Sequence, residues 1–517
     1  MISSPSTSSK SVDGHSKVLD SKILGAFSPY VVRKEIVHMQ EISRLPRFIS
    51  EYLVAKFCSQ NEPSAEDLKR LADFVNIHFP ELRDKDKILH DLMSLGSYTL
   101  MDEFKVETDI KGGVHRLVIP CLNVRDGKIL STILDENADL LRSGMWGIAT
   151  LKYDPDEEMD VQQAPLLGTI DNSDPMDSPV SPVIQPKRAR AVSTPVLMTK
   201  FTPFEVSNVS LKEFASKRAD FTRDEWVEVL LRSVGLNPGA YSQSQRILML
   251  IRLVPLVESN CNILELGPKA TGKTYLYRNI SYSTRLISGG RVSPAILFYN
   301  IASKTVGEIG MRDCVALDEI GKLVFSNSEE MIGKLKDYMV DGFFERGPKK
   351  ANAKASLVFM GNLEVTDRYP KGRDVVASLP SFMEDSALLD RVHSFIPGWE
   401  LPKIMQSSEH LASGYGIVCD YLSEIFHQMS FQSFSPLISE RVRFRADNVT
   451  IRDEKAIKKI SSGLLKLLRP DATCDDSDIS ISVDAAVKGR ERINSLLHEL
   501  SPQEFPEKRF EYSVIES

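Results

Sequence analysis

The sequence predicts an α/β fold with a parallel sheet, completed by a helical lid and preceded by a small α+β domain. Three observations lead to this fold class. Apolar segments of strand length alternate with helix-compatible segments between residues 208 and 401, which is typical of a parallel sheet. From about Pro402 the pattern is entirely helical. Residues 18–155 combine amphipathic helices with short alternating strands.

The composition is that of an ordinary soluble protein, and 517 residues are enough for two to four domains. The longest apolar stretch, residues 247–257, is interrupted by Arg252 and Pro255, so we expect no membrane span and a cytoplasmic location. The six cysteines form no C-x-x-C pair, which argues against a zinc site and a disulfide framework. A net charge of −7 argues against nucleic acid wrapped over the whole surface, so such binding requires a locally basic feature.

Three segments precede the predicted sheet. Residues 1–17 are Ser-rich and are predicted to be a disordered tail. In residues 18–155, helices followed by short strands indicate one α+β domain, for which we expect an OB-like barrel. Residues 156–207 are acidic and then Pro- and Ser-rich, and this composition predicts a linker. The basic run at residues 186–190 is either a solvated linker charge or a DNA or targeting contact.

An apolar strand at residues 263–266 leads into the pattern Gly-x-x-x-x-Gly-Lys-Thr. The glycines allow backbone N–H groups to surround a β-phosphate, the lysine reaches the β and γ oxygens, and the threonine hydroxyl holds Mg²⁺. The preceding strand and the following helix-compatible stretch distinguish the pattern from a chance match. We therefore expect a nucleoside triphosphate, ATP or GTP, with Mg²⁺. The predicted nucleotide-binding residues are Gly267, Pro268, Lys269, Ala270, Thr271, Gly272, Lys273 and Thr274.

A second apolar strand, residues 313–317, ends in the acids Asp318 and Glu319 about forty-five residues after the loop. We expect Asp318 and Thr274 to be the metal-binding residues, with Asp318 acting on Mg²⁺ through water. Glu319 is then the general base that polarises the attacking water. An acidic pair on the surface is the alternative, but the position one strand-helix cycle after a phosphate loop favours the catalytic interpretation.

Three further residues match positions used by ATPases of the AAA+ class. Asn362 ends another buried strand and matches sensor 1, which orients the water; a turn-forming Gly-Asn is the alternative. Arg391 matches the arginine finger that projects into a neighbouring subunit's nucleotide, and a surface pair with Asp390 is the alternative. Arg452 begins an amphipathic helix and suits a sensor 2 role on the lid. The predicted catalytic residues are Glu319, Asn362, Arg391 and Arg452.

Between the acids and Asn362, residues 339–358 predict a hairpin with a Gly-Pro turn and lysines at its tip. In a ring ATPase, a hairpin before sensor 1 points at the central pore. The basic residues are therefore placed for sequence-independent contacts to DNA phosphates, while solvated loop lysines are the alternative. The predicted DNA-binding residues are Arg346, Lys349, Lys350 and Lys354.

Several segments together resemble the BrxL family, the Lon-related AAA+ proteins of BREX phage-exclusion systems. They are the phosphate loop and residues 287–290, 297–300, 315–319, 336–347 and 397–402. The resemblance runs from about Asp20 to the C-terminus. It implies an AAA+ P-loop ATPase core at residues 208–401, a helical lid at 402–500 and an MCM-like N-terminal domain. It also implies a homo-oligomeric ring of about six subunits or a stacked double ring, with double-stranded DNA and other phage-defence proteins as partners.

The sequence departs from the family pattern at a few positions. Lys269 and Ala270 stand where the family has Arg-Gly, and Thr274 stands where it has Ser, although the backbone cradle and the magnesium hydroxyl are retained. Long members continue into a Lon-type protease domain with a Ser–Lys dyad, whereas this sequence ends soon after residue 513. We therefore expect a short form without protease activity, in which residues 501–517 are a C-terminal tail.

These observations lead to one principal hypothesis and two alternatives. The principal hypothesis is an ATP-dependent ring ATPase that binds or encircles duplex DNA in antiviral defence. An AAA+ protein unfoldase serving a separate protease is the first alternative; its pore loops need aromatic and apolar residues, whereas this hairpin offers lysines. A scaffold that binds ATP to assemble and hydrolyses it slowly is the second.

Overall fold

The computed structural model describes residues 8–38, 42, 44–58, 63–109, 113–142, 144–155, 194–204, 209–365, 370, 372–445 and 449–515. Contacts divide the chain into two compact units. The barrel unit is Ile77–Phe204, and the sheet unit combines Met1–Asn76 with Glu205–Ser517. Across the described residues, no helix has both the length and the apolar character needed to cross a membrane.

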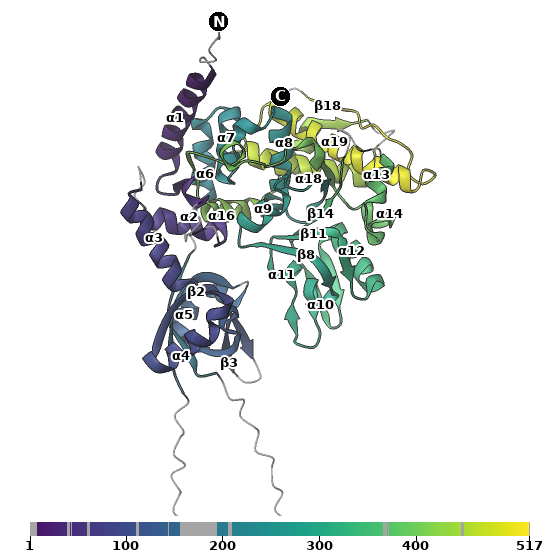
Figure 1. Ribbon diagram of the computed structural model, residues 1–517. Coiled ribbons are helices and arrows are strands. Elements are labelled where there is room, and N and C mark those ends of the chain that lie inside the picture. The colour runs from purple at the N-terminus through teal and green to yellow at the C-terminus, as the bar shows by residue number, and fades with distance from the viewer. Residues whose placement is uncertain are drawn as a thin grey trace, which may run out of the picture. The chain divides into compact units, whose positions relative to one another are not determined.

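The sheet unit is built on a five-stranded sheet with the order β15-β7-β14-β11-β8, in which all neighbours are parallel. Figure 1 shows β8, β11 and β14 side by side, with helices α12 (Ser328–Asp341) and α14 (Ser386–Leu389) beside them. Every residue of β7 is buried, as an inner parallel strand requires. The predicted parallel α/β fold is confirmed. The strands are β7 Asn262–Gly267, β8 Thr284–Val292, β11 Cys314–Phe325, β14 Ser356–Asn362 and β15 Ser394–Pro397.

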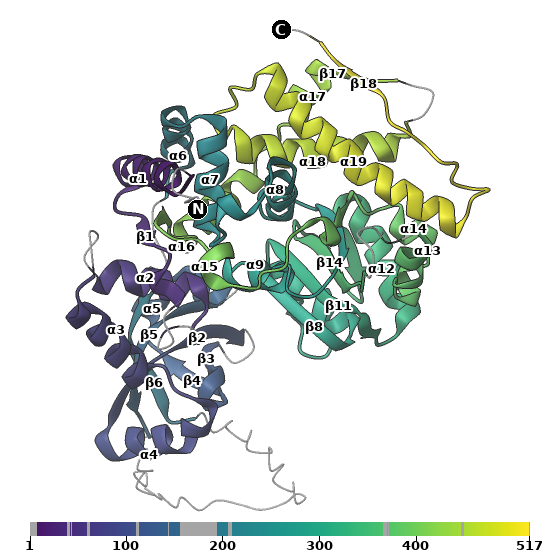
Figure 2. The same cartoon turned by 45° about the horizontal axis from the view of Figure 1, so that its top comes forward.

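Helices surround this sheet. Helix α8 (Gln243–Val257) begins with a capping box in which Ser242 and Gln245 satisfy each other's backbone N–H groups. The long helices α18 (Ile451–Leu468) and α19 (Asp476–Leu500) run alongside each other, α18 against α8 and α19 against β15 (Figure 2). Helices α18 and α19 each bury an apolar face. The periodic spacing of those apolar residues is the pattern that predicted a helical lid.

The region after Pro402 is not entirely helical, contrary to the sequence analysis. Strand β16 (Tyr415–Ile417) pairs with β1 (Val31–Arg33), and β17 (Val442–Phe444) pairs with β18 (Tyr512–Val514) in the predicted C-terminal tail. Strands of three residues are too short to carry a recognisable alternation, and their partners lie far away in the sequence.

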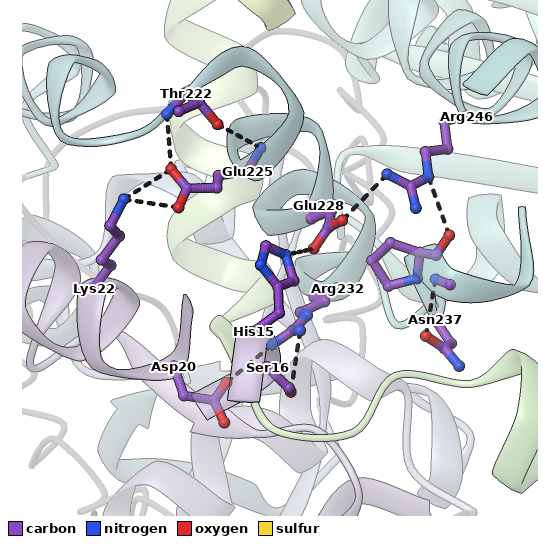
Figure 3. Close-up of polar contacts among 12 residues, drawn as sticks. His15, Ser16, Asp20, Lys22, Thr222, Glu225, Glu228, Arg232, Asn237 and Arg246 are labelled. Atoms are coloured by element: carbon purple, nitrogen blue, oxygen red, sulfur yellow. Dashed lines mark hydrogen bonds and ion pairs between the residues drawn. The ribbon is translucent and has the colours of Figure 1, made fainter. Parts of the chain in front are cut away.

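The N-terminal segment of the chain packs within the sheet unit. Helix α1 (Ser8–Phe27) begins inside the predicted disordered tail and buries Leu19, Ile23 and Phe27. Its polar side chains pair with helix α7 (Arg223–Ser233), as Figure 3 shows. The pairs are Lys22 with Glu225 at 2.7 Å, Asp20 with Arg232 at 2.9 Å and His15 with Glu228 at 3.2 Å. The contacts of α1 therefore tie it to α7 across about 200 residues of sequence.

A buried ion-pair cluster joins four more segments of the sheet unit. Lys34 precedes helix α2 (Arg47–Phe57), and Glu51 lies on it. Both side chains are fully buried, and the Lys34 ammonium lies 2.8 Å from a carboxylate oxygen of Glu51. Lys34 also donates to the carbonyls of Ser233 and Ile417, and Glu51 accepts from the backbone N–H of Cys419. The segment around α2 is thereby fixed to α7, β16 and the helix α16 (Cys419–Ser430).

The barrel unit contains a closed barrel with the strand order β2-β3-β4-β6-β5. Helix α4 (Lys85–Leu95) packs against β2, and α5 (Ser131–Glu136) lies in the connection between β4 and β5. Large apolar side chains such as Phe104, Leu117 and Met198 fill the interior. The strands are β2 Ser97–Asp109, β3 Val114–Ile119, β4 Val124–Ile129, β5 Met145–Tyr153 and β6 Val196–Pro203.

Strand β6 corrects the predicted linker of residues 156–207. It pairs antiparallel with β5 and parallel with β4, and so closes the barrel. The strand was missed because its eight residues follow a long Pro- and Ser-rich stretch that dominates the local composition. Residues 156–193, including the basic run at 186–190, and residues 205–208 lie outside the described residues.

Candidate nucleotide-binding site

The Gly-x-x-x-x-Gly-Lys-Thr segment forms a tight loop between β7 and helix α9 (Lys273–Asn279). Two loop residues have positive φ, Ala270 at +66° and Gly272 at +81°. A side chain at Gly267 would meet the backbone of Gly398 at 2.6 Å, so the close approach of these two segments requires glycine. Ala270 is a non-glycine residue in the left-handed region of backbone conformation and therefore bears a modest strain.

Donors from the protein occupy four carbonyl oxygens of the loop. The Lys273 ammonium donates to Gly267 and Pro268, at 2.8 Å each. The backbone N–H of Ile404 donates to Ala270 at 2.7 Å, and the Arg252 guanidinium donates to Thr271 at 2.9 Å. In a trans peptide the N–H of one residue points opposite to the carbonyl of the residue before it. Contacts that hold the loop carbonyls therefore point the N–H groups of the same peptides away from those contacts. Such a row of N–H groups binds anions.

Lys273 is only 5% exposed. Burial lowers the pKa of its ammonium; the nearby Glu265 carboxylate opposes this shift and Arg252 adds to it. A buried cation that bonds only to carbonyl oxygens gains from an anionic partner. Triphosphate oxygens are such a partner, and Lys273 begins the helix that follows the loop.

The two predicted metal-binding residues lie in contact. The Thr274 hydroxyl donates to Asp318 at 2.7 Å, and the other Asp318 oxygen accepts from the backbone N–H of Glu319 at 2.8 Å. A hydroxyl and a carboxylate are hard oxygen ligands of the kind Mg²⁺ prefers, and Mg²⁺ takes its remaining ligands from water and phosphate. The residues present therefore fit a magnesium ion bound together with a nucleotide.

Glu319 has an unusual backbone conformation for a non-glycine residue, with φ at +51°. Such strain clusters at functional sites, where the surrounding structure enforces it. The Glu319 carboxylate pairs at 3.1 Å with Lys322 of the same strand, and the Lys322 side chain is 73% exposed. Lys322 is thus a neighbour of the predicted general base that no sequence pattern indicates.

Asn362 is brought to the same edge of the sheet as the loop. It is the last residue of β14, where it pairs in register with Gly267 of β7. Strand β14 lies between β7 and β11, which carries Asp318 and Glu319. The phosphate loop, the two acids and Asn362 therefore share the carboxyl edge of a parallel sheet, where ligands of open α/β folds bind.

Arg391 and Arg452 lie at the opposite edge. The Asn262 side chain donates to the carbonyl of Arg391 at 3.4 Å, and Asn262 is the first residue of β7, five residues before the loop. Five strand residues span roughly 17 Å. Arg452 reaches the same edge through an ion pair with Asp390. The structure does not bring these two arginines to the phosphate loop of their own chain.

The surroundings of Arg391 argue against a simple surface pair with Asp390. Asp390 is paired instead with Arg452 and with Arg490, at 2.6 Å from Arg490. Burial and then the charge of Arg452 lower the pKa of Arg391. The Arg391 guanidinium donates to the carbonyl of Ala387, and within the described residues its Nε is buried without a partner. Two neighbouring cations thus lie together at this edge.

Sequence reasoning missed two residues below the phosphate loop. Arg252 on α8 and Glu265 on β7 are fully buried and form a two-bonded ion pair, at 3.0 and 2.5 Å. The signal was available, because each charge interrupts an otherwise apolar segment. From the sequence alone, Arg252 is only an interruption of the longest apolar stretch.

The predicted hairpin is present as β12 (Phe343–Arg346) and β13 (Lys349–Asn352). Lys349 and Lys350 are exposed at its tip, and Lys350 pairs with Glu345 at 3.2 Å. Arg346 is instead held within the protein by Glu330 at 3.0 Å and by the carbonyl of Tyr299. The Lys354 ammonium lies 4.2 Å from the centre of the Phe431 ring, after the hairpin's second strand.

A cavity of about 810 Å³ lies among α7, α8 and the lid helices. Leu248 and Leu468 contribute apolar walls, and charged side chains line the remainder. The buried hydroxyl of Tyr241, in the wall, has no hydrogen-bond partner within the described residues. Glu400, also in the wall, ends the turn η8 (Gly398–Glu400), whose first residue packs on the phosphate loop.

A phosphate loop with a strand-end acid pair and a polar residue on the intervening strand defines a P-loop ATPase of the AAA+ class. The family model described as "Lon-like protease BrxL-like, ATPase domain" matches residues 196–511, and "BREX system Lon protease-like protein BrxL N-terminal" matches residues 25–153. The chain belongs to the BrxL family.

Two curated relatives have the same name, Lon-like protease BrxL. The protein of Escherichia coli O9:H4 (strain HS) is 33% identical over 502 residues, which cover 96% of this chain and 67% of the relative. The protein of Bacillus cereus (strain H3081.97) is 32% identical over 504 residues, which cover 96% of this chain and 69% of the relative.

Proposed function

We propose that the protein is an ATP-dependent, ring-forming ATPase that binds or encircles double-stranded DNA in a BREX-type antiviral defence. The observation that carries the proposal is the distance between the two halves of the catalytic machinery. The loop, the acids and Asn362 lie at one edge of the sheet, whereas Arg391 lies at the other. A complete site then requires Arg391 from a second copy of the chain.

The proposed chemistry is hydrolysis of the γ-phosphate. The loop N–H groups and Lys273 hold the triphosphate, while Thr274 and Asp318 hold Mg²⁺, which neutralises phosphate charge when bound. Glu319 accepts a proton from the attacking water, and Asn362 orients that water. The cavity among α7, α8 and the lid helices has a volume within the usual range of ligand pockets, and its wall includes Glu400 of the turn whose Gly398 packs on Gly267 of the loop. We propose that this cavity takes the nucleoside, which would give the Tyr241 hydroxyl the partner that it lacks within the described residues.

We propose a closed ring of about six subunits, or two such rings stacked, because each nucleotide requires an arginine from a neighbour. The position of Arg452 supports its action in the same neighbouring site as Arg391, since both contact the Asp390 region. In this proposal, Arg452 acts as sensor 2 on the nucleotide of the adjacent subunit and not on the nucleotide of its own subunit.

The DNA contacts in this proposal are made by the hairpin tips and the barrel unit. Lys349 and Lys350 are exposed on a short, two-stranded support and suit phosphate contacts that do not depend on sequence. We further propose that the five-stranded closed barrel is OB-like, a fold whose barrels bind oligonucleotides. Other phage-defence proteins are the remaining proposed partners, and the proposed location is the cytoplasm.

Steady-state ATP turnover, measured alone, with duplex DNA and with an unfolded polypeptide, tests the proposal. We expect duplex DNA to raise turnover and the polypeptide to leave it unchanged. Stimulation by the polypeptide alone would favour the unfoldase alternative. Slow turnover that responds to neither, together with ATP-dependent assembly, would favour the scaffold.

A further inference from the structure

The buried pair of Arg252 and Glu265 is placed directly below the phosphate loop. The Nε and Nη2 groups of Arg252 donate to the Glu265 carboxylate, and its Nη1 group donates to the carbonyl of Thr271 at 2.9 Å. The Nη1 group also lies 3.2 Å from the sulfur of Met249. Arg252 is 0% exposed, and so is Glu265. One planar group therefore links helix α8, strand β7 and the loop.

A buried ion pair is an expensive way to hold two elements together. Removing two charges from water costs several kcal/mol per ion, and apolar side chains of similar volume often stabilise such a position equally well. The surrounding segments of α8 and β7 are otherwise apolar and would accommodate that solution. The third contact, to Thr271, is the one that an apolar pair cannot make.

That contact determines the orientation of one peptide group in the loop. Because the peptide between Thr271 and Gly272 is planar and trans, holding the carbonyl toward Arg252 points the Gly272 N–H to the opposite side. Gly272 has φ at +81°. Because glycine has no Cβ, its backbone can adopt many conformations, so the direction of this peptide needs a contact to fix it. The Ala270 carbonyl is held by a backbone N–H, whereas the Thr271 carbonyl depends on this side chain.

We propose that Arg252 is a positioning residue for nucleotide binding, which presets the Gly272 N–H toward the phosphates, and that Glu265 fixes the guanidinium for this task. The proposal rests on the proposed nucleotide binding at the loop. Arg252 donates two hydrogen bonds to Glu265, and these fix the plane of its guanidinium group. The remaining nitrogen, Nη1, is then directed at the carbonyl of Thr271.

The opposing interpretation is that the pair only joins α8 to β7. The double variant Arg252→Met with Glu265→Leu separates the two, because it removes both charges of the pair together and leaves neither partner as an unpaired buried charge. Thermal unfolding reports on the fold, and a fluorescent ATP analogue reports on the dissociation constant. Steady-state kinetics then give KM and kcat separately.

We expect the double variant to unfold within a few degrees of the parent but to bind nucleotide about tenfold more weakly, as the loss of one well-oriented hydrogen bond to a charged group implies. KM should rise to the same extent while kcat changes by less than about threefold, since Arg252 does not touch the reacting atoms. Arg252→Lys, which keeps the charge but not the fork, should show the same rise in KM.

A matched control lies at the C-terminal end of α8, where Glu258 is the capping residue. Glu258 and Lys466 form another buried pair at 2.7 Å, without contact to the loop. The variant Glu258→Leu with Lys466→Met should leave nucleotide affinity within twofold of the parent. If the Arg252 double variant or Arg252→Lys is folded and binds nucleotide as the parent does, the positioning role is wrong. If the parent itself fails to bind ATP, the proposed function fails instead.

Discussion

In the proposed mechanism Lys273 holds the triphosphate and Glu319 acts on the attacking water, so their substitution should separate binding from turnover. Lys273→Ala removes the buried ammonium that donates to the loop carbonyls of Gly267 and Pro268, and we expect nucleotide binding to be lost. Glu319→Gln keeps the size of the side chain and removes the proton acceptor, so binding should be retained while turnover falls at least a hundredfold. Equilibrium binding of labelled ATP and phosphate release measure the two effects.

The matched control for this pair is Lys322→Gln. Lys322 contacts Glu319 but lies outside the loop, and its loss should leave nucleotide affinity unchanged. Turnover by Glu319→Gln at the parental rate would show that another residue is the general base.

Asp420, in the first turn of α16, makes the stability of the fold depend on pH. Burial, and to a lesser extent the nearby Glu51, raises the pKa of Asp420 to about 7, and one carboxylate oxygen lacks a partner within the described residues. In the unfolded chain the same pKa is about 3.9. The folded state therefore holds a proton that the unfolded state releases between about pH 4 and pH 7, and stability falls as pH rises through this range.

Asp420→Asn should remove this dependence, because an amide does not ionise. We expect the variant to be more stable than the parent by about 2–4 kcal/mol at pH 8, with the difference falling below about 1 kcal/mol near pH 4. Denaturant unfolding of both proteins across this pH range measures the difference. A constant difference at all pH values would mean that Asp420 titrates with the same pKa in both states.

Among the elements of the fold, the hairpin β12–β13 offers the sharpest test of DNA binding. Its tip presents Lys349 and Lys350, while Arg346 is occupied by Glu330 and Tyr299. Replacing both lysines with alanine should weaken duplex binding equally for all sequences and flatten the slope of log affinity against log salt. Ring assembly and ATP binding should be unchanged, since the two lysines lie in a two-stranded sheet separate from the strands that carry the loop and the acids.

Binding of a labelled duplex over a salt series provides the measurement. The variant Lys17→Ala with Lys212→Ala removes the same charge from exposed positions on helices and serves as the control. If the hairpin variant and the parent have identical slopes, the DNA contacts lie elsewhere, with the barrel unit as the next candidate.

At the scale of the whole molecule, the proposed role of Arg391 in a neighbouring site requires cooperation between subunits. Arg391→Ala alone and Lys273→Ala alone should each be inactive as ATPases. Mixed rings contain interfaces at which the intact loop of one variant meets the intact arginine of the other, so mixing should restore part of the activity. Turnover is measured as a function of the mixing ratio.

The control is a mixture of Lys273→Ala with Glu319→Gln. Both substitutions damage the same half of the site, and no mixed interface is then complete. Full ATPase activity at concentrations where only monomers are present would contradict the shared site.

The residues at the carboxyl edge of the sheet could be predicted from the sequence, and so could the hairpin. The phosphate loop, Asp318, Glu319 and Asn362 belong to short contiguous patterns, in which an apolar strand is followed directly by the residues that it positions. Each pattern depends on local backbone geometry, so the neighbouring residues are sufficient to recognise it. The register of β14 against β7 then places these residues together.

Other features were decided only by packing between distant segments. Arg252 meets Glu265 and Thr271 across a helix-strand contact, Arg452 meets Asp390 across sixty-two residues, and strand β6 closes the barrel from beyond a long Pro- and Ser-rich stretch. Periodicity and composition describe the face that a segment buries but not the segment that covers it. The sequence by itself thus determined which residues the loop edge carries, whereas the tertiary structure decided that the two arginines lie at the other ends of the strands. The physical reason is that the parallel direction and register of neighbouring strands set which ends lie together.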